Sequence, residues 1–377
     1  MDQQGQNGLM TTFRSSVRMR GAGAWVIFIL LAGFYCLLYF PGTVESVPDV
    51  ITPIAEAIGL RNKWFFYGLL YSVAVTVGAV FYLRKHGNSA YNRKRMAVNV
   101  TMQCLLAFTL PLVMPYFLTD DPGEYGRYES YANYFWPLAW YDFHPSTLES
   151  KAPAIAAWSL GGALVLSPVM AVVFGKRWYC SWVCGCGALA NTFGDPWRHL
   201  TSKSTKSWRF EKVAVHTVLV LAFVSTILII IDHYYGSDMP TLRKWVAGEG
   251  WTVKKTYGFV VGSILAGVVG TGLYPLLGPR VWCRNFCPMA AMLGLLQKLG
   301  RFHIRVKKDM CISCGNCTTY CEMGIDVRAY AQKNESFTRA SCVGCGMCAH
   351  VCPRGVLKLE NDRLAHKPEK KSLPVVR

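Results

Sequence analysis

The sequence predicts a mainly α-helical membrane protein, with a bundle of six transmembrane helices followed by a small α+β domain at the carboxyl end. Three observations predict this fold class. Apolar residues make up 52% of the 377 positions and charged residues only 16%, below the roughly 25% of a soluble domain. Six runs have the length and apolar character of membrane spans. Thirteen of the 15 cysteines lie between Cys180 and Cys352. This composition excludes a disordered chain and argues against a soluble enzyme.

The six apolar runs define the predicted bundle. In chain order they are 22–40, 64–83, 97–118, 153–174, 213–235 and 257–278. Each has about 20 residues, the length that a helix needs to cross the hydrocarbon core of a bilayer. The one formal charge within them is Asp232, so the alternative of buried helices in a large soluble core is disfavoured. We therefore expect a membrane domain over residues 22–300, in which the first run is retained because no small-residue cleavage site follows it.

The distribution of basic residues predicts the orientation of the bundle. Segments 1–21, 84–96, 175–212 and 279–377 would lie on one side of the membrane, and they carry 32 Lys and Arg residues against 8 in the segments between. Cytoplasmic loops carry this excess in membrane proteins. We therefore expect a multi-pass membrane protein with both termini in the cytoplasm. The net charge of +18 then reflects topology, and we expect no nucleic-acid partner.

The segment 119–152 would be the longest loop on the outer side. It is rich in aromatic residues, and its six acidic residues face only Arg127 and Lys151. One interpretation is an aromatic belt in contact with membrane lipid. The other is a docking surface for redox subunits on the outer side. Both interpretations stay open.

Residues 301–360 are predicted to form a cytoplasmic metal-binding domain, followed by a flexible tail over 361–377. The domain contains two runs with the spacing C-x2-C-x2-C-x3-C, which is typical of [4Fe–4S] ligands, and the fourth cysteine of such a run ligates the other cluster. We therefore expect two [4Fe–4S] clusters. Their ligands would be Cys311, Cys314, Cys317 and Cys352 for the first, and Cys342, Cys345, Cys348 and Cys321 for the second.

Two further features of these runs bear on the prediction. Gly315 and Gly346 follow the second cysteine of each run and would allow a tight turn. Glu322 stands where a proline usually follows the fourth cysteine, and it would alter the exposure or the potential of the neighbouring cluster. Structural zinc is the alternative, but zinc-binding cysteine pairs are usually separated by a longer insert.

A second cysteine motif occurs twice after predicted spans. Cys180 and Cys184 follow the fourth span, and Cys283 and Cys287 follow the sixth. A shift of 103 residues aligns these pairs and also places Gly175 on Gly278, Arg177 on Arg280 and Ala188 on Ala291. The repeat predicts two helix–loop units related by a pseudo-twofold axis at the cytoplasmic face.

The four thiols of this repeat are candidate ligands of a third centre, either an iron–sulfur cluster or a single iron. Cysteines four residues apart lie on one face of a helical turn. Arg177, Arg280 and Arg284 would offset the thiolate charge. Cys186 would be a spare for Cys184. The alternative is a set of packed thiols or a transient dithiol, because the cytoplasm keeps thiols reduced.

With these motifs in place, the chain resembles, over roughly residues 64–360, the membrane polyferredoxin family typified by NapH and the carboxyl-terminal half of NosR. The tail looks like a bacterial two-cluster ferredoxin. The resemblance implies a location in the bacterial cytoplasmic (inner) membrane. It also implies electron transfer to or from quinol and periplasmic redox partners, with quinone as an additional ligand. It favours an electron-transfer subunit, linking quinone or a cytoplasmic donor to outer-side partners in a larger complex, over a stand-alone enzyme.

Two other functions remain open from the sequence. An assembly or maturation factor would use its clusters to reduce a metal or a thiol for another enzyme. A membrane regulator would use them to sense redox state. Asp232 and His233, near the outer end of the fifth span, are weaker candidates for a quinone head group. Cys36 and Cys104 lie within spans and are expected to be inert.

Overall fold

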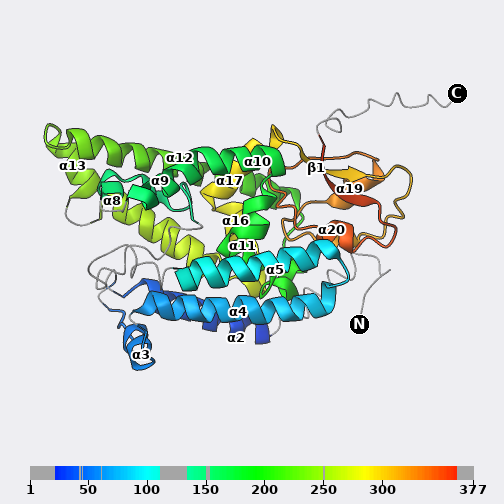
Figure 1. Cartoon of the computed structure of the whole chain (residues 1–377), viewed down its shortest axis with the longest axis horizontal. Coiled ribbons are helices and arrows are strands. Elements are labelled where there is room, and N and C mark those ends of the chain that lie inside the picture. The colour runs from blue at the N-terminus through cyan, green and yellow to red at the C-terminus, as the bar shows by residue number, and fades with distance from the viewer. Residues whose placement is uncertain are drawn as a thin grey trace.

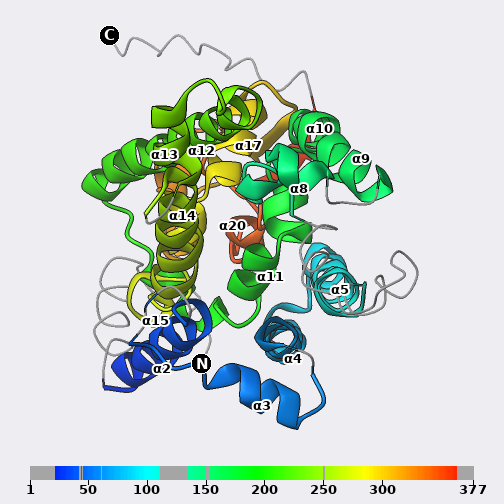
Figure 2. The same cartoon turned by 90° about the vertical axis from the view of Figure 1, so that its left-hand side faces the viewer.

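The computed structural model describes residues 22–41, 44, 46–60, 62–110, 134–149, 153–248 and 251–362. The fold is mainly helical, and the cysteine-rich domain lies at one end of the long helices (Figure 1). Figure 2 looks along these helices, which surround α11 (Gly185–Asn191). The predicted segment 1–21, most of the loop 119–152 and the tail from residue 363 lie outside the described residues.

Four of the described helical stretches are long and apolar enough to cross a membrane. They are α2 (Ala22–Tyr39), α4 (Lys63–His86), the stretch Pro153–Phe174 and α12 (Thr205–Tyr235). Pro153–Phe174 consists of α9 (Pro153–Gly161), η4 (Gly162–Leu166) and α10 (Ser167–Phe174). Apolar side chains on these helices face outward, as Leu30, Phe81 and Val213 do, with 67%, 63% and 69% of their surface exposed. An exposed apolar belt of this kind is the surface that lipid covers.

The other two predicted spans are not confirmed as spans. The third run forms α5 (Ala90–Cys104) and η1 (Leu105–Thr109), and residues 111–118 lie outside the described part. The sixth run is divided: α14 (Val253–Tyr257) continues into η7 (Gly258–Val269), and α15 (Tyr274–Leu277) follows after a turn. Gly270 and Gly272 lie in this turn and Pro275 begins the next helix. Glycine and proline both oppose a continuous helix.

Shorter elements close the two ends of the bundle. At the end away from the cysteine-rich domain lie α3 (Ile51–Ala57), η3 (Trp140–Phe143), α8 (Pro145–Glu149) and α13 (Pro240–Ala247). The elements that carry or flank the C-x3-C motifs are η5 (Trp178–Val183), α11, η6 (Asp195–Leu200), α16 (Val281–Asn285) and α17 (Pro288–Lys298).

The cysteine-rich domain combines a two-stranded sheet with three short helices. Strand β1 (Phe302–Val306) pairs antiparallel with β2 (Leu357–Asn361), with Phe302 opposite Asn361 and Val306 opposite Leu357. The helices between the strands are α18 (Asn316–Thr319), α19 (Val327–Gln332) and α20 (Met347–His350). Pairing the first and last segments of the domain brings its two cysteine loops together.

The domain is packed directly against the helical bundle. One apolar core includes Phe302 and Val343 of the domain together with Trp282 and Met289 of the C-x3-C region. Hydrogen bonds cross the same boundary: Ser181 Oγ donates to the carbonyl of Val343 at 2.7 Å. The loop that carries the second cysteine run is therefore held on the bundle by both apolar and polar contacts.

Candidate metal centres

The structure brings Cys352 to the first cysteine run. Cys311, Cys314, Cys317 and Cys352 line one small cavity. Gly315 has a φ of 82°, a left-handed conformation, and begins α18, so that Cys317 follows in the first turn of this helix. Glycine adopts this conformation without the steric cost of a Cβ atom. An all-thiolate donor set around a cavity of this kind fits the predicted [4Fe–4S] cluster.

The second run has the same local geometry, with Cys321 as its fourth neighbour. Gly346 has a φ of 78° and begins α20. Burial raises the pKa of Cys348, and negative charge on Cys345, Cys342 and Cys321 raises it further. The two crossed cysteines also accept equivalent backbone hydrogen bonds: Ile325 N donates to Cys321 Sγ, and Val356 N donates to Cys352 Sγ, both at 3.4 Å. Hydrogen bonds to cysteine sulfur are among the features that set the potential of such clusters.

The C-x3-C repeat is present in the backbone as well as in the sequence. Gly175 and Gly278 precede the two motifs with φ of 77° and 95° and ψ of 173° and 167°. This region of conformational space is essentially restricted to glycine. Cys184 and Cys287 both lie in extended conformation at the start of a following helix, α11 and α17 respectively. The pairs of residues 103 positions apart therefore hold equivalent structural positions.

All four thiols of the repeat are buried in one place. Cys180, Cys184, Cys283 and Cys287 are 4–6% exposed. Burial raises the pKa of Cys287, and the neighbouring thiolates of Cys283, Cys180 and Cys184 raise it further. The reason for this convergence differs from the one predicted. The two cysteines of a pair do not share one face of a continuous helix, because the first lies in a helical turn and the second begins the next helix.

The arrangement of the side chains bears on whether the repeat could hold a single metal ion. Within the described residues, no three His, Cys, Asp or Glu side chains are close enough to hold one metal ion. A tetrahedral zinc site would need four ligands at about 2.3 Å from one atom. Thiols that ligate different irons of one cluster are farther apart. The described residues therefore show no group for the single iron considered from the sequence. An iron–sulfur cluster on the repeat stays a prediction, as does the alternative of packed thiols or a transient dithiol.

Cys186, the predicted spare ligand, lies beside Cys184. Its side-chain hydrogen bond is the main reason why the pKa of Cys184 is lowered to about 7. Cys186 also lines a cavity of about 600 Å³ among the helices. It therefore connects the four buried thiols to that cavity.

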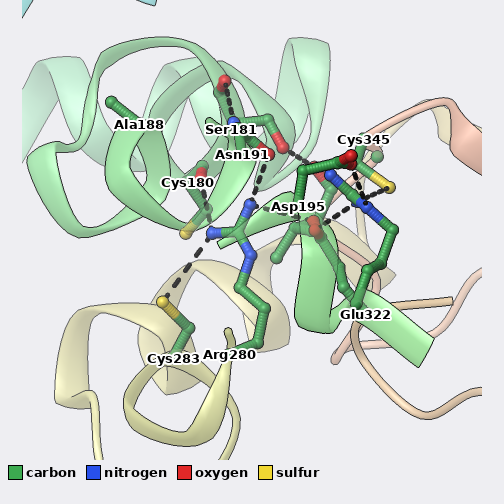
Figure 3. A network of polar contacts seen from close by, with 12 residues as sticks. Cys180, Ser181, Ala188, Asn191, Asp195, Arg280, Cys283, Glu322 and Cys345 are labelled. Atoms are coloured by element: carbon green, nitrogen blue, oxygen red, sulfur yellow. Dashed lines mark hydrogen bonds and ion pairs between the residues drawn. The ribbon is translucent and has the colours of Figure 1, made fainter. Parts of the chain in front are cut away.

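A buried carboxylate joins the two cysteine regions (Figure 3). Glu322 is 0% exposed and forms ion pairs with Arg198 and Arg280. Burial raises the pKa of Glu322, but the two guanidinium groups outweigh it and hold the pKa below its usual value. Arg280 Nη1 lies 3.8 Å from Cys283 Sγ, and Arg198 Nη1 lies 3.9 Å from Cys345 Sγ. The chain Cys283–Arg280–Glu322–Arg198–Cys345 thus runs from the C-x3-C repeat to the second cysteine run.

Arg198 is fixed from its other side by Asp195 of η6, which also contacts the last residues of α4. Asp195 Oδ1 accepts a hydrogen bond from Arg198 Nε at 3.1 Å, and Asp195 Oδ2 lies 3.5 Å from Lys85 and 3.4 Å from His86. Arg198 is 1% exposed. Its guanidinium is therefore held in one position by two carboxylates.

Polar residues of α5 hold the loop of the first C-x3-C motif. Asn99 Nδ2 donates to the carbonyls of Ser181 and Trp182 at 3.0 and 2.7 Å, and Gln103 Nε2 donates to the carbonyl of Val183 at 2.7 Å. The sequence reasoning missed these two side chains. The available signal was a pair of amide residues four positions apart within an otherwise apolar run, because polar groups at membrane depth usually have a role.

The three predicted arginines have different surroundings. Arg280 lies near a thiol, as described above. Arg177 stacks on Phe302, with 4.7 Å from its Cζ to the ring centre. Arg284 pairs with Glu211 at 2.8 Å. Arg198 is not one of the predicted arginines, yet like Arg280 it lies beside a cysteine sulfur, that of Cys345.

The cavity that Cys186 lines is strongly aromatic. Its wall includes tyrosines, tryptophans and phenylalanines: Tyr35, Tyr39, Trp64, Phe65, Tyr67, Tyr71, Phe108, Tyr134, Trp140, Tyr257 and Trp282. Tyr71 donates a hydrogen bond to the carbonyl of Gly185 at 2.8 Å, next to Cys186. The weaker quinone candidates lie elsewhere: His233 pairs with Glu149 at 3.3 Å, and neither Asp232 nor His233 lines this cavity.

Comparison with known families identifies iron–sulfur domains in both cysteine regions. Residues 304–359 match a family described as a 4Fe-4S dicluster domain. Residues 156–204 and 260–307 match a family described as a 4Fe-4S binding domain, and these two segments contain the two C-x3-C motifs. The relationship to [4Fe–4S] proteins therefore extends to the repeat and is not confined to the tail.

The chain spans about half the length of the curated relatives that it matches. YccM of Escherichia coli (strain K12), named as a proposed electron transport protein, is 24% identical over 188 residues, 48% of this chain and 51% of YccM. The methylamine utilization ferredoxin-type protein MauN of Paracoccus denitrificans (strain Pd 1222) is 25% identical over 176 residues, 44% of this chain and 55% of MauN. No solved structure matches. The chain is a 4Fe-4S ferredoxin-domain protein with four candidate membrane helices, related to YccM and MauN.

Proposed function

We propose that this chain is an integral-membrane electron-transfer subunit of the NapH/NosR type, which links quinone or a cytoplasmic donor to outer-side redox partners within a larger complex. The observation that carries the proposal is the position of the C-x3-C thiols. They lie between the ferredoxin-like domain, reached through Arg280, Glu322 and Arg198, and the aromatic cavity, reached through Cys186. The names of YccM and MauN, an electron transport protein and a ferredoxin-type protein, support the same reading.

The residues have separate tasks in this proposal. Each bound cluster supplies a site that takes up and releases one electron. The crossed sets of four cysteines hold two clusters in the domain, and the four thiols of the repeat hold a third. Backbone N–H groups of Ile325 and Val356, and the guanidinium groups of Arg198 and Arg280, face cysteine sulfurs and stabilise their negative charge.

The aromatic cavity is the proposed quinone site. Its volume of about 600 Å³ lies within the range of small-molecule sites, roughly 300–1,000 Å³. Tyr134 would offer its hydroxyl group to a ring carbonyl, since the Tyr71 hydroxyl is already donated to Gly185. The aromatic wall would pack on the ring. Cys186 lines the same wall, so a quinone bound in this cavity would lie close to the thiols of the repeat.

Compartments and partners complete the proposal. Both termini would lie in the cytoplasm, and the segment 119–152 would contact outer-side subunits or lipid.

One observation favours a second function, the maturation of another enzyme. Cys184 and Cys186 are close enough to hydrogen-bond, and a pair of neighbouring thiols is suited to reducing a partner's disulfide or metal.

The composition of the native complex tests the proposed function. The chain is tagged at its chromosomal locus, solubilised from membranes under anaerobic conditions and purified with its partners. Stable recovery of other redox subunits, together with reduction of the chain's clusters by an added quinol, is the expected result. A chain that purifies alone, and whose loss affects only the assembly of a target enzyme, would support the maturation function instead.

A further inference from the structure

A second cavity lies where α12 and α17 meet the cysteine-rich domain. Its volume is about 600 Å³, and it is separate in its lining from the aromatic cavity. Basic side chains dominate its wall: Lys176, Lys212, Arg284, Lys298 and Arg339, with His216 beside them. Glu211 is the one acidic residue among the lining residues. The cavity therefore has an excess of positive charge.

The single carboxylate does not neutralise this charge. Glu211 accepts a hydrogen bond from Arg284 Nε at 2.8 Å, and Arg284 Nη1 donates to the carbonyl of Ser202 at 2.6 Å. Arg284 is 4% exposed, and its Nη2 has no hydrogen-bond partner in the described part of the chain. A buried guanidinium nitrogen without an acceptor is costly. Arg284 therefore brings a buried cation to the cavity wall with Glu211 as its carboxylate partner.

Two other cations are arranged around an indole. Lys212 Nζ lies 3.8 Å from the ring centre of Trp208, and Arg339 Cζ lies 4.9 Å from it. Arg339 also donates to the hydroxyl of Tyr330 at 3.0 Å. Among the described residues, no carboxylate forms an ion pair with it. Trp208 thus fixes one cation from the bundle and one from the cysteine-rich domain on the same wall.

The cavity lies beside the basic first turns of α12, one of the candidate membrane helices. Phe210 and Val213 are on the neighbouring faces of α12 and are 56% and 69% exposed, as expected of lipid-facing residues. Lys212 lies between them in sequence, near the basic end of this helix. A basic pocket between membrane helices on the cytoplasmic side is a typical binding place for lipid head groups.

We propose that this cavity binds a phosphate-bearing anion, held by Arg284, Lys212, Lys298 and Arg339. A phosphate group presents several acceptor oxygens, and the planar guanidinium matches them with paired N–H donors. Two sources carry this chemistry, the head group of an anionic phospholipid and a free phosphate. Since Cys283 also lines the cavity, the anion would lie beside a thiol of the C-x3-C repeat. Binding itself does not depend on the clusters or on the proposed electron transfer.

Binding is measured on the purified full-length protein, delipidated in detergent and then exposed to single probes. The probes are phosphatidylglycerol, phosphatidylcholine and inorganic phosphate, and native mass spectrometry reports the bound species. The test variant is Lys212→Gln combined with Arg339→Gln. The control is Lys244→Gln on α13, at the opposite end of the bundle.

We expect phosphatidylglycerol to bind better than phosphatidylcholine and the double variant to bind it about thirtyfold more weakly, because each cation near an anionic lipid contributes to binding. Competition by inorganic phosphate would identify a soluble phosphate as the source, and its absence would identify the lipid. Lys298→Gln, at an exposed position, is the second variant if the double variant loses its fold. Equal binding of phosphatidylglycerol by the control and by folded cavity variants would overturn the proposal.

Discussion

Arg280 Nη2 donates a hydrogen bond of 2.9 Å to Oε1 of Glu322, across 42 positions of the chain. Arg280 precedes the second C-x3-C motif by three residues, and Glu322 follows the last cysteine of the first ferredoxin-like run. Both residues are buried, with 1% and 0% exposed surface. The pair fixes the cysteine-rich domain on the bundle at the point where two candidate centres approach one another.

Replacing Glu322 should therefore loosen the attachment of the domain. Glu322→Gln removes the carboxylate partner of Arg280 and leaves Arg198 with Asp195 alone. Breaking a buried ion pair by removing one partner costs about 3–5 kcal/mol. Thermal unfolding in detergent and limited proteolysis should show a less stable protein. The matched control is Glu335→Gln on the exposed surface of the same domain. Equal stability of the two variants would show that the pair is not needed for attachment.

The same variant should change the potentials of the neighbouring centres. A cluster gains negative charge on reduction, so removing a nearby carboxylate makes reduction easier and raises the midpoint potential. The effect should reach the centre near Cys345 and the one near Cys283, because the two arginines link both to Glu322. A redox titration followed by electron paramagnetic resonance measures it. An unchanged potential in Glu322→Gln would contradict the assigned coupling.

Crossed ligation makes a selective prediction for Cys352. Because this cysteine lines a cavity with Cys311, Cys314 and Cys317, Cys352→Ala should damage their centre and spare the centre at Cys342, Cys345 and Cys348. Paramagnetic resonance on the reduced variant distinguishes the two signals. Loss of the other signal would show that each run holds its own cluster.

Iron analysis tests the third centre. Three four-iron clusters would give about twelve irons per chain, and two would give about eight. In anaerobically purified protein, Cys180→Ser combined with Cys283→Ser should lower the iron content by about four. The corresponding replacement of Cys36 and Cys104, which lie outside the cysteine clusters, serves as the control. If the unchanged protein and the double variant both contained about eight irons per chain, the repeat would hold no cluster.

The glycines that precede the two motifs should be equally sensitive. Gly175→Ala and Gly278→Ala place a Cβ atom on a backbone with φ of 77° and 95°, and strained conformations of this kind cost about 1–3 kcal/mol each. Both variants should unfold at lower temperature. Gly161→Ala is the control, since this glycine ends α9 with an ordinary helical φ of −62° and open space around it. If Gly175→Ala and Gly278→Ala were as stable as Gly161→Ala, the two positions would not require glycine.

The sequence predicted the parts of the candidate site that depend on short-range spacing. The turns at Gly315 and Gly346 and the equivalence of the two C-x3-C units follow from residues that are close together in the chain. The sixth apolar run was harder to interpret, because Gly270, Gly272 and Pro275 interrupt it. Composition alone does not show that such a run is divided.

Long-range partners were beyond the reach of sequence patterns. Arg198 and Glu322 are 124 positions apart, and nothing in the sequence near either residue names the other. Asn99 and Gln103 support a loop some 80 positions away. The aromatic cavity is likewise assembled from residues of several helices and of the segment near Tyr134. Each of these features depends on how the elements pack together.

The fixed packing of the cysteine-rich domain against the helical bundle has a consequence for the rate of electron exchange. A domain on a loose tether exchanges electrons only when diffusion brings it to its partner, so its rate falls as the solvent becomes more viscous. Here a continuous apolar core and the Arg198–Glu322–Arg280 contacts fix the separation of the two cysteine regions. Electron exchange between them would be a fixed-distance tunnelling event, insensitive to glycerol or sucrose in the buffer. Any dependence on viscosity in turnover would then belong to the arrival or departure of an external partner.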